Sequence, residues 1–425
     1  MSERPQFIAH IDVNSAYLSW TAMDHLRRGG KIDYRTVPAI VGGDPKTRHG
    51  IVLAKSIPAK KFGVQTAELV WQACKKCPGL IVLPGDYRLY TECSKAMMSI
   101  IREYSDRVYV YSIDEAFIDL TGMQKLFGDP IELVDTIRER IRDELGFTVS
   151  IGISSNMLLA KMGSDMRKPD ATTTLFPHEI QKKMWPLPIE DLFMCGRATT
   201  EKLKRLGIYT IGSLAGANPT VIQGHLKSHG AMLWNYANGI SSGIQSSFKA
   251  HDVPRGIGNS TVTRNDVTSK EVALLYLLSL SESVAMRMRA ENLGGSVVSI
   301  AVRDTEFTGR QMQKKMDAEI RTTNDIYNVA QYLLEKLWYE GEPLRHFGVR
   351  CSGLHKRTDY QYSLLQNVDR AEDAEEAVFR IRQRYGNSSI MRASFLHGKV
   401  KPIVGSAYYD DEEEIPIFAQ GLQMR

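Results

Sequence analysis

The chain has 425 residues, of which 43% are hydrophobic and 24% are charged, and its net charge is +5. This length is too great for a single hydrophobic core and predicts three or four compact units of a soluble globular protein. No run of eighteen apolar residues and no apolar leader is present, so we expect a cytoplasmic protein and neither a membrane nor a secreted one. Five consecutive acids lie at residues 410–414, so the rest of the chain has a larger positive net charge than the whole chain. This basic remainder favours a polyanionic partner.

The first predicted element is a strand at residues 7–13, where two sets of residues alternate between two faces and Asp12 lies near the end. A short helix is predicted at residues 21–28, ended by two glycines. Residues 37–84 then alternate strand-like and helical runs. Cys74 and Cys77 in this region form a C-x-x-C pair, but no second pair of metal ligands accompanies them, so we predict buried thiols.

An amphipathic helix at residues 86–105 precedes the sequence VYVYSIDEAFIDLTG at residues 108–122, which predicts a strand, a tight turn and a second strand. Successive strand residues point to opposite faces, so Asp114 and Glu115 can converge only where the backbone bends. Two adjacent carboxylates repel each other, and solvent or a cation such as magnesium must offset them. A solvated hairpin tip explains the pair alone, whereas the third acid, Asp12, favours a two-metal site for phosphoryl or nucleotidyl transfer.

A further helix is predicted at residues 131–145 and a strand at residues 147–153. Ser154, Ser155 and Asn156 are good helix caps and predict a helix that carries Lys161 and ends near residue 168. This order of elements indicates an α+β sheet. The N-terminus of the last helix could hold a phosphate beside the acids. The alternative is that Lys161 is simply a solvated residue on the surface of this helix.

Four motifs together resemble the Y-family (translesion) DNA polymerases of the bacterial DNA polymerase IV and V type. They are DVNSAYLSW at residues 12–20, AKKFGV at 59–64, YSIDEAFIDLTG at 111–122 and VSIGISSNMLLAKMGSDMRKP at 149–169. Their order and spacing are those of the family, and the resemblance covers about the first 355 residues. It implies a multidomain α+β fold with a palm at residues 1–19 and 86–175, fingers at 20–85, a helical thumb at 176–245, a little finger at 256–358 and a tail at 359–425.

The resemblance implies a low-fidelity, template-directed DNA polymerase that bypasses damaged bases. Its catalytic residues would be Asp12, Asp114 and Glu115, which would hold two Mg²⁺ ions together with the Val13 carbonyl. Tyr17 would exclude ribonucleotides, and Lys60 and Lys168 would bind the nucleoside triphosphate. Two positions depart from the family, because Ile57 and Met157 stand where it has hydrogen-bond donors.

The basic residues of the later regions are expected to contact primer–template DNA. In the thumb, LFMCGRATTEKLKRLGIYTIGSLAG resembles a helix-hairpin-helix, with a helix capped by Thr199 or Thr200, although Cys195 replaces one glycine of the usual hairpin. The little finger is expected to contain helices at residues 269–290 and 324–338 and strands at 296–302 and 346–354. The implied DNA-binding residues are Gly196, Arg197, Gly207, Arg255, Arg264, Arg303 and Arg310, with Lys314 and Lys315.

The tail is expected to contain a helix at residues 371–384 and to serve a partner. Gln361, Leu364 and Leu365 lie in a segment that resembles the peptide with which bacterial polymerases bind the sliding clamp, although a last strand of the little finger would also fit. A monomer is expected. Two other functions stay open: a catalytically silent DNA-binding subunit with polymerase architecture, and a nucleotide cyclase, which would leave the basic thumb and little finger unexplained.

Overall fold

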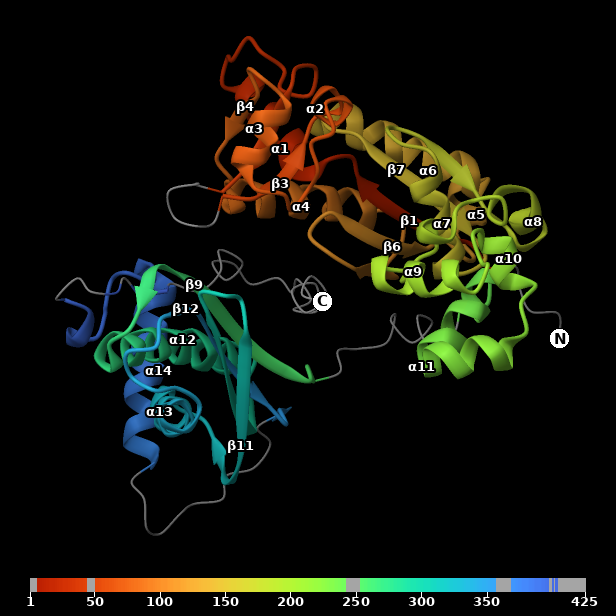
Figure 1. Ribbon diagram of the computed structural model, residues 1–425. Coiled ribbons are helices and arrows are strands. Elements are labelled where there is room, and N and C mark those ends of the chain that lie inside the picture. Colours follow the sequence, from red (N-terminus) through yellow and green to blue (C-terminus); the bar gives the residue numbers. More distant parts are fainter. Residues whose placement is uncertain are drawn as a thin grey trace. The chain divides into compact units, whose positions relative to one another are not determined.

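The computed structural model describes residues 6–43, 50–241, 253–356, 368–396, 400 and 402–403. The described residues form two compact units, with residues 6–43 and 51–241 in the first and residues from 253 onward in the second. Figure 1 shows the helices and strands of both units. The expected clamp-binding residues Gln361, Leu364 and Leu365 and the acids at residues 410–414 lie outside the described residues.

The centre of the first unit is a five-stranded sheet in the order β5-β6-β1-β7-β8. The central strand β1 is buried at every position and pairs antiparallel with β6 and β7. The strand predicted at residues 7–13 is therefore the middle of the sheet, and Asp12 lies at its end. The strands are β1 (Ile8–Val13), β5 (Val108–Val110), β6 (Glu115–Asp119), β7 (Val149–Ser154) and β8 (Thr172–Thr174).

Helices pack against this sheet, and α7 lies closest to its central strands. A Cβ at Gly152 on β7 would overlap the carbonyl oxygen of Ala160, so only glycine allows α7 to approach this far. The helix α1 begins five residues earlier than predicted, after Ser15 in a left-handed conformation. The helices are α1 (Ala16–Arg27), α4 (Tyr87–Arg102), α5 (Gln124–Phe127), α6 (Pro130–Arg140), a π-helical turn (Ile141–Leu145) and α7 (Met157–Met166).

The region expected to be the fingers has its own three-stranded sheet, in the order β3-β2-β4. Its core is small, with seven fully buried side chains that include Ile40, Val52 and Cys77. The prediction for the cysteines is half right, because Cys77 is buried but Cys74 is exposed on α3. The elements are β2 (Ala39–Gly42), β3 (Val52–Lys55), α2 (Ile57–Lys61), α3 (Val70–Lys76) and β4 (Ile81–Leu83).

Short helices follow the sheet. Gly196 caps α9, so the predicted cap at Thr199 or Thr200 is wrong; the chain already turns into the helix at Gly196. Gly207 adopts a positive φ of 78° after α9, and the Thr210 side chain caps α10 by accepting from the Ser213 amide. The helices are α8 (Ile180–Lys183), α9 (Arg197–Arg205), α10 (Ile211–Ala215) and α11 (Pro219–Ala237), with 3₁₀ turns at Pro177–Glu179 and Ile189–Asp191.

The second unit is a five-stranded antiparallel sheet packed on two helices, in which the order is β11-β10-β12-β9 and the short β13 also pairs with β10. The two predicted helices and the two predicted strands are present, whereas β9 and β11 were not predicted as strands. The sequence of β11, GRQMQKKMDAEI, is mostly polar and exposed, so it lacks an apolar alternation. The elements are β9 (Gly256–Val267), α12 (Lys270–Ala290), β10 (Leu293–Asp304), β11 (Gly309–Ile320), α13 (Thr323–Leu337), β12 (Leu344–Ser352) and β13 (His355–Lys356).

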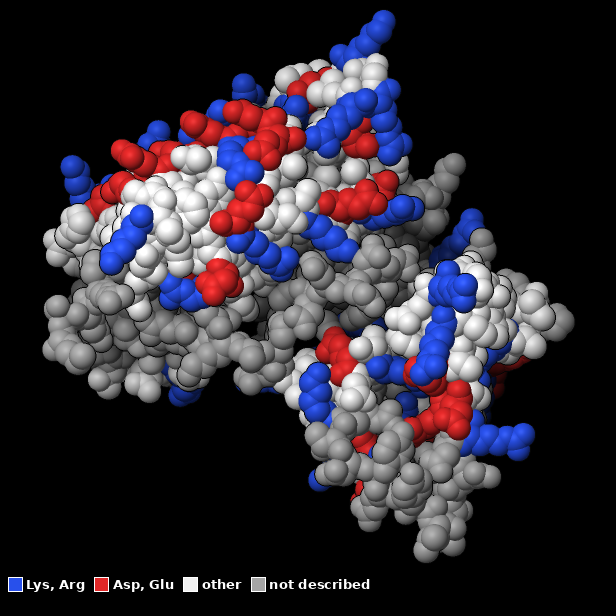
Figure 2. Space-filling model, turned by 180° about the vertical axis from the view of Figure 1, so that it is seen from behind, with Lys and Arg blue, Asp and Glu red and all other residues white. Residues whose placement is uncertain are grey.

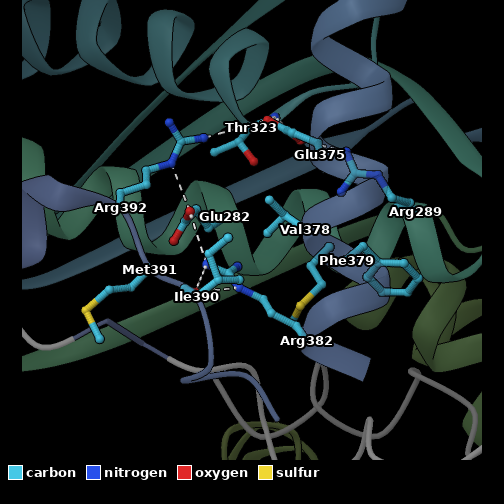
Figure 3. A pocket seen from close by; sticks show the side chains of 11 residues that line it. Glu282, Arg289, Thr323, Glu375, Val378, Phe379, Arg382, Ile390, Met391 and Arg392 are labelled. Atoms are coloured by element: carbon cyan, nitrogen blue, oxygen red, sulfur yellow. Dashed lines mark hydrogen bonds and ion pairs between the residues drawn. The ribbon is translucent and has the colours of Figure 1, made fainter. Parts of the chain in front are cut away.

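The helix expected in the tail is α14 (Val368–Tyr385), and it packs against the helices of the second unit. Figure 3 shows this contact, in which Arg289 of α12 pairs with Glu375 of α14 at 2.6 Å. Arg321 pairs with Glu372 at 3.2 Å. A 3₁₀ turn at Ala393–Phe395 follows, and the Arg392 side chain returns to Glu282 of α12 at 2.8 Å. The helix of the predicted tail is therefore part of the second unit.

Candidate active site

The three acids singled out by the sequence meet at one end of the central sheet. In the antiparallel pair of β1 and β6, Asp12 is the register partner of Glu115. Asp114 lies in the turn between β5 and β6, and its carbonyl accepts a hydrogen bond of 3.0 Å from the Val13 amide. Tyr111 and Ser112 both donate their amides to the Glu115 carbonyl and so close the turn. The bend required for adjacent acids to converge is therefore present.

Two lysines after β7 neutralise two of these acids. Lys161 Nζ lies 2.9 Å from Glu115 Oε1, and Lys168 Nζ lies 2.9 Å from Asp12 Oδ1. The Lys161 side chain is only 9% exposed and lies 5.2 Å from the Tyr111 ring centroid and 5.6 Å from that of Phe193. The alternative in which Lys161 is a solvated helix residue is wrong, because its ammonium is buried beside a carboxylate and between aromatic rings.

Burial raises the pKa of Asp12 and of Asp114, so these two carboxyl groups ionise less readily than they would in water. It raises the pKa of Asp12 from 3.8 to about 6, against the opposing charge of Lys168 and with the help of the neighbouring Glu115. Burial also raises the pKa of Asp114 to about 6, although a 2.5 Å hydrogen bond from the Ser112 hydroxyl favours its charged form. In this arrangement, ionised acids are stable only with cations nearby.

The donor types of this cluster suit magnesium, which prefers carboxylate and carbonyl oxygens. The side chains are nevertheless turned toward protein partners: Asp12 toward Lys168, Glu115 toward Lys161 and Asp114 toward Ser112. Among the residues that the structure describes, no three side chains are arranged as a ready-made metal site. The cluster fits a hard cation by its chemistry, and binding one requires these side chains to exchange partners.

His10 is a residue of this site that the sequence reasoning missed. It is fully buried on β1, and burial lowers its pKa well below 6.5, so it is neutral. Ser164 Oγ donates to the Lys161 carbonyl and therefore accepts from His10 Nδ1 at 2.8 Å. The unprotonated Nε2 then lies 3.8 Å from Glu115 Oε2. The available signal was its position, two residues before Asp12 and so on the same face of β1.

Tyr17 lies on α1 within a group of aromatic side chains. Its ring stacks on that of Tyr90, with centroids 4.4 Å apart and an interplanar angle of 12°. Trp20 and Tyr87 also lie within about 6 Å. Because Tyr90 is fully buried, this stack fixes the half-buried Tyr17 ring in place.

The residues expected to grip the triphosphate are not all brought together. Lys60 lies in the last turn of α2, and Ile57 at the start of that helix is 52% exposed. Met157, by contrast, is 2% exposed and packs with Ile8 and Phe117. Met157 therefore belongs to the core, and its departure from the family does not leave a gap in an open site.

The expected DNA contacts of the helical region are exposed. Gly196 is the N-cap of α9, and a Cβ there would meet open space. Arg197 is 94% exposed and pairs with Glu201 one turn later. Gly207 turns the chain between α9 and α10. Gly196 and Gly207 thus flank α9, and Arg197 is its first residue.

The sheet of the second unit has one face away from its core. Val298, Ile300 and Val302 of β10 point into the core, so Arg303 points to the opposite face, called here the open face. Its register partner is His346 on β12, which pairs in turn with Val262 on β9, two residues before Arg264. Arg264 and Arg303 are thus on the open face, and Arg255 is exposed just before β9.

Arg310 does not fit the expectation of a DNA contact on this face. It is the register partner of the core residue Val302, and it binds the Leu337 carbonyl and Glu342 instead. Lys314 also lies on the helical side, 4.4 Å from the Tyr332 ring centroid of α13. Lys315 lies on the open face. The strand register places Arg350 on the same face, and the sequence reasoning missed this residue.

Figure 2 shows the surface from behind, and acidic and basic side chains are interspersed on it. The described residues on this side of each unit lack the uninterrupted positive charge expected of a surface that binds the DNA backbone. Along the paired middle of the open face, in contrast, the side chains are small, amide-bearing or basic. They are Ser260, Val262, Val297, Ser299, Ala301, Arg303, Gln311, Gln313, Lys315, His346 and Arg350.

The fold matches that of a Y-family DNA polymerase chimera, with a TM-score of 0.68 and 19% identity, over 83% of this chain and all of that one. The sequence matches the impB/mucB/samB family at residues 11–165 and that family's C-terminal domain at residues 254–364. No described helix is both long and apolar enough to cross a membrane.

Two curated relatives match nearly the whole chain. DNA polymerase IV of Clostridium acetobutylicum is 42% identical, over 93% of this chain and 99% of the relative. DNA polymerase IV 2 of Bacillus subtilis is 34% identical, over 93% and 95%. The architecture is that of the Y-family DNA polymerases as a class. The chain belongs to the impB/mucB/samB family within it.

Proposed function

We propose that the chain is a template-directed DNA polymerase of low fidelity, which adds deoxynucleotides to a primer 3′-hydroxyl and continues past damaged template bases. The observation that carries this proposal is the β1–β6 register, which sets Asp12 opposite Glu115 with Asp114 in the adjoining turn. The relatives named DNA polymerase IV support the reaction. The small core of the fingers region agrees with an open, permissive nucleotide site.

Asp12, Asp114, Glu115 and the Val13 carbonyl would hold two magnesium ions. Bound there, the ions lower the pKa of the primer hydroxyl and neutralise charge on the triphosphate. Lys161 engages Glu115 Oε1 and leaves Oε2 available. Lys168, which pairs with both Asp12 and Asp165, would turn from Asp12 toward a phosphate oxygen, and Lys60 would supply a second ammonium. Tyr17 would exclude ribonucleotides by the bulk of its ring.

The open face of the second unit and the two ends of α9 would bind the DNA backbone. Arg264, Arg303, Lys315 and Arg350 supply charge without base readout, and the amides around Gly196 supply neutral donors. Docking on a sliding clamp through Gln361, Leu364 and Leu365 remains a proposal from the sequence. A catalytically silent subunit is disfavoured, because the relatives that match nearly the whole chain are named DNA polymerase IV. Primer extension in Mg²⁺, lost in Asp114→Ala, separates the two functions.

The metal-free protein is expected to lose stability as pH rises. Because the pKa values of Asp12 and Asp114 are raised from 3.8 to about 6, the folded state binds these protons more tightly than the unfolded state. Their stabilising contribution is full below pH 3.8 and is lost as pH rises through about 6. Asp114→Asn should flatten this dependence, as measured by thermal melts in a chelator. If the melting temperature of Asp114→Asn fell with pH as steeply as that of the wild type, the assignment of this pH dependence to Asp114 would be contradicted.

A further inference from the structure

The turn between β10 and β11 holds an aromatic side chain in an unfavourable position. Phe307 is 67% exposed and lies outside the core of its unit. Its backbone has a φ of 68°, a left-handed conformation that is uncommon for a bulky residue. The exposed ring contributes little to the stability of the fold, and the left-handed backbone opposes folding, a cost that an asparagine or glycine would avoid. Strain of this kind concentrates where a residue serves a ligand.

The turn that carries Phe307 is well ordered by its own hydrogen bonds. Asp304 Oδ1 accepts from the amides of Glu306 and Thr308, each at 2.9 Å. The Asp304 amide donates to the Thr308 carbonyl at 3.2 Å, and the Phe307 amide donates to the Asp304 carbonyl at 3.3 Å. The carboxylate of Asp304 is thus used inside the turn, and the ring is presented on a preorganised support.

Arg345 lies against one face of this ring. Its guanidinium carbon is 4.6 Å from the Phe307 ring centroid, and its Nη1 donates to the Thr305 carbonyl. Arg345 sits at an irregularity of β12, where the register with β10 shifts between Arg303 and Asp304. The guanidinium therefore fixes the ring from one side, and it adds positive charge beside it.

The surroundings favour a nucleic-acid ligand over an apolar protein groove. Arg303 and its register partner His346 lie at this end of the open face, and Arg264 of β9 lies nearby on the same face. Glu306 is the exposed acid beside the ring. An aromatic ring beside arginines is the usual platform for an unpaired base, because stacking needs a π-face that duplex DNA does not offer.

We propose that Phe307, supported by Arg345, stacks on an unpaired base of the single-stranded template. This proposal rests on the function proposed above and names one contact of the template strand. It assigns the β10–β11 turn a role distinct from that of the open face, which binds the backbone.

The test uses the full chain and primer–templates in which 2-aminopurine replaces successive bases of the unpaired template. Wild type and Phe307→Tyr should quench the fluorescence at one or two positions, whereas Phe307→Asn and Phe307→Leu should not. Loss of one stacked base should weaken binding of the overhang substrate about fivefold to tenfold. Binding of a blunt duplex and the single-turnover rate at saturating DNA should stay unchanged. Phe307→Asn should melt at or above the wild-type temperature, because asparagine tolerates a left-handed backbone.

Tyr332→Leu is the matched control, since Tyr332 is also an exposed aromatic residue paired with a cation, but on the helical side of the sheet. Wild-type quenching and affinity in Phe307→Asn would overturn the proposal, and so would equal loss of affinity for overhang and blunt substrates. Loss of clamp-stimulated synthesis with quenching retained would assign the ring to a protein partner instead. Failure of wild type to extend any primer would refute the proposed function. Primer extension and fluorescence quenching are separate measurements, so this outcome is distinguishable from failure of the stacking proposal.

Discussion

Glu115→Gln and Asp114→Asn are expected to abolish primer extension, and Asp114→Asn should do so without destabilising the protein. Each change removes one ligand charge from the proposed metal site, and losing about 4 kcal/mol of transition-state stabilisation corresponds to roughly a thousandfold lower rate. Burial already raises the pKa of Asp114 to about 6, so a neutral amide removes an unfavourable charge from the metal-free state. The melting temperature of Asp114→Asn should be unchanged or higher.

Single-turnover extension and thermal melts measure the two effects separately. Glu139→Gln is the matched control, because Glu139 is a half-exposed acid on α6 that pairs only with Arg138 in the described structure. It should keep wild-type activity. Extension at the wild-type rate by either active-site variant would show that these acids do not serve catalysis. Loss of activity in Asp114→Asn accompanied by a large fall in melting temperature would indicate a structural role for Asp114.

Tyr17→Ala is expected to relax the choice of sugar by about a hundredfold. The Tyr17 ring is fixed by its stack on the buried Tyr90, so it cannot swing away to admit a 2′-hydroxyl. Removing the ring opens that space without changing the acids or lysines. The ratio of kcat/KM for deoxynucleotide and ribonucleotide measures the effect.

Tyr17→Phe keeps the ring and should keep the preference for deoxynucleotides. If Tyr17→Ala still rejects ribonucleotides as wild type does, the ring is a core residue and another group selects the sugar. If Tyr17→Phe and Tyr17→Ala both lose selectivity, the hydroxyl and not the bulk of the ring is responsible.

The meeting of the three acids could be predicted from the sequence, because it depends on local rules. The period of two along residues 7–13 places Asp12 on one face of a strand, and adjacent acids imply a bend at residue 114. Antiparallel pairing then brings the two strand ends together. The family resemblance added the order of the regions, which the matched family and the similar fold support.

The burial of Lys161 could not be predicted, because it depends on contacts between distant segments. Tyr111 lies fifty residues before it and Phe193 thirty-two after it, and only the packed fold brings their rings to its ammonium. Arg310 was misplaced for a similar reason. Its strand has no apolar alternation, so its face is decided by pairing opposite Val302, which the sequence of β11 does not encode locally.

Primer extension across an abasic site is the most direct test of the central claim. With Mg²⁺, four deoxynucleotides and an undamaged template, wild type should add the complementary nucleotide at each position, and on the abasic template it should continue past the lesion. Asp114→Ala should do neither, although it should bind the same DNA. Absence of extension by wild type on the undamaged template would contradict the assignment of a polymerase. Extension that stops at the abasic site, and at every other lesion tried, would contradict the assignment of damage bypass.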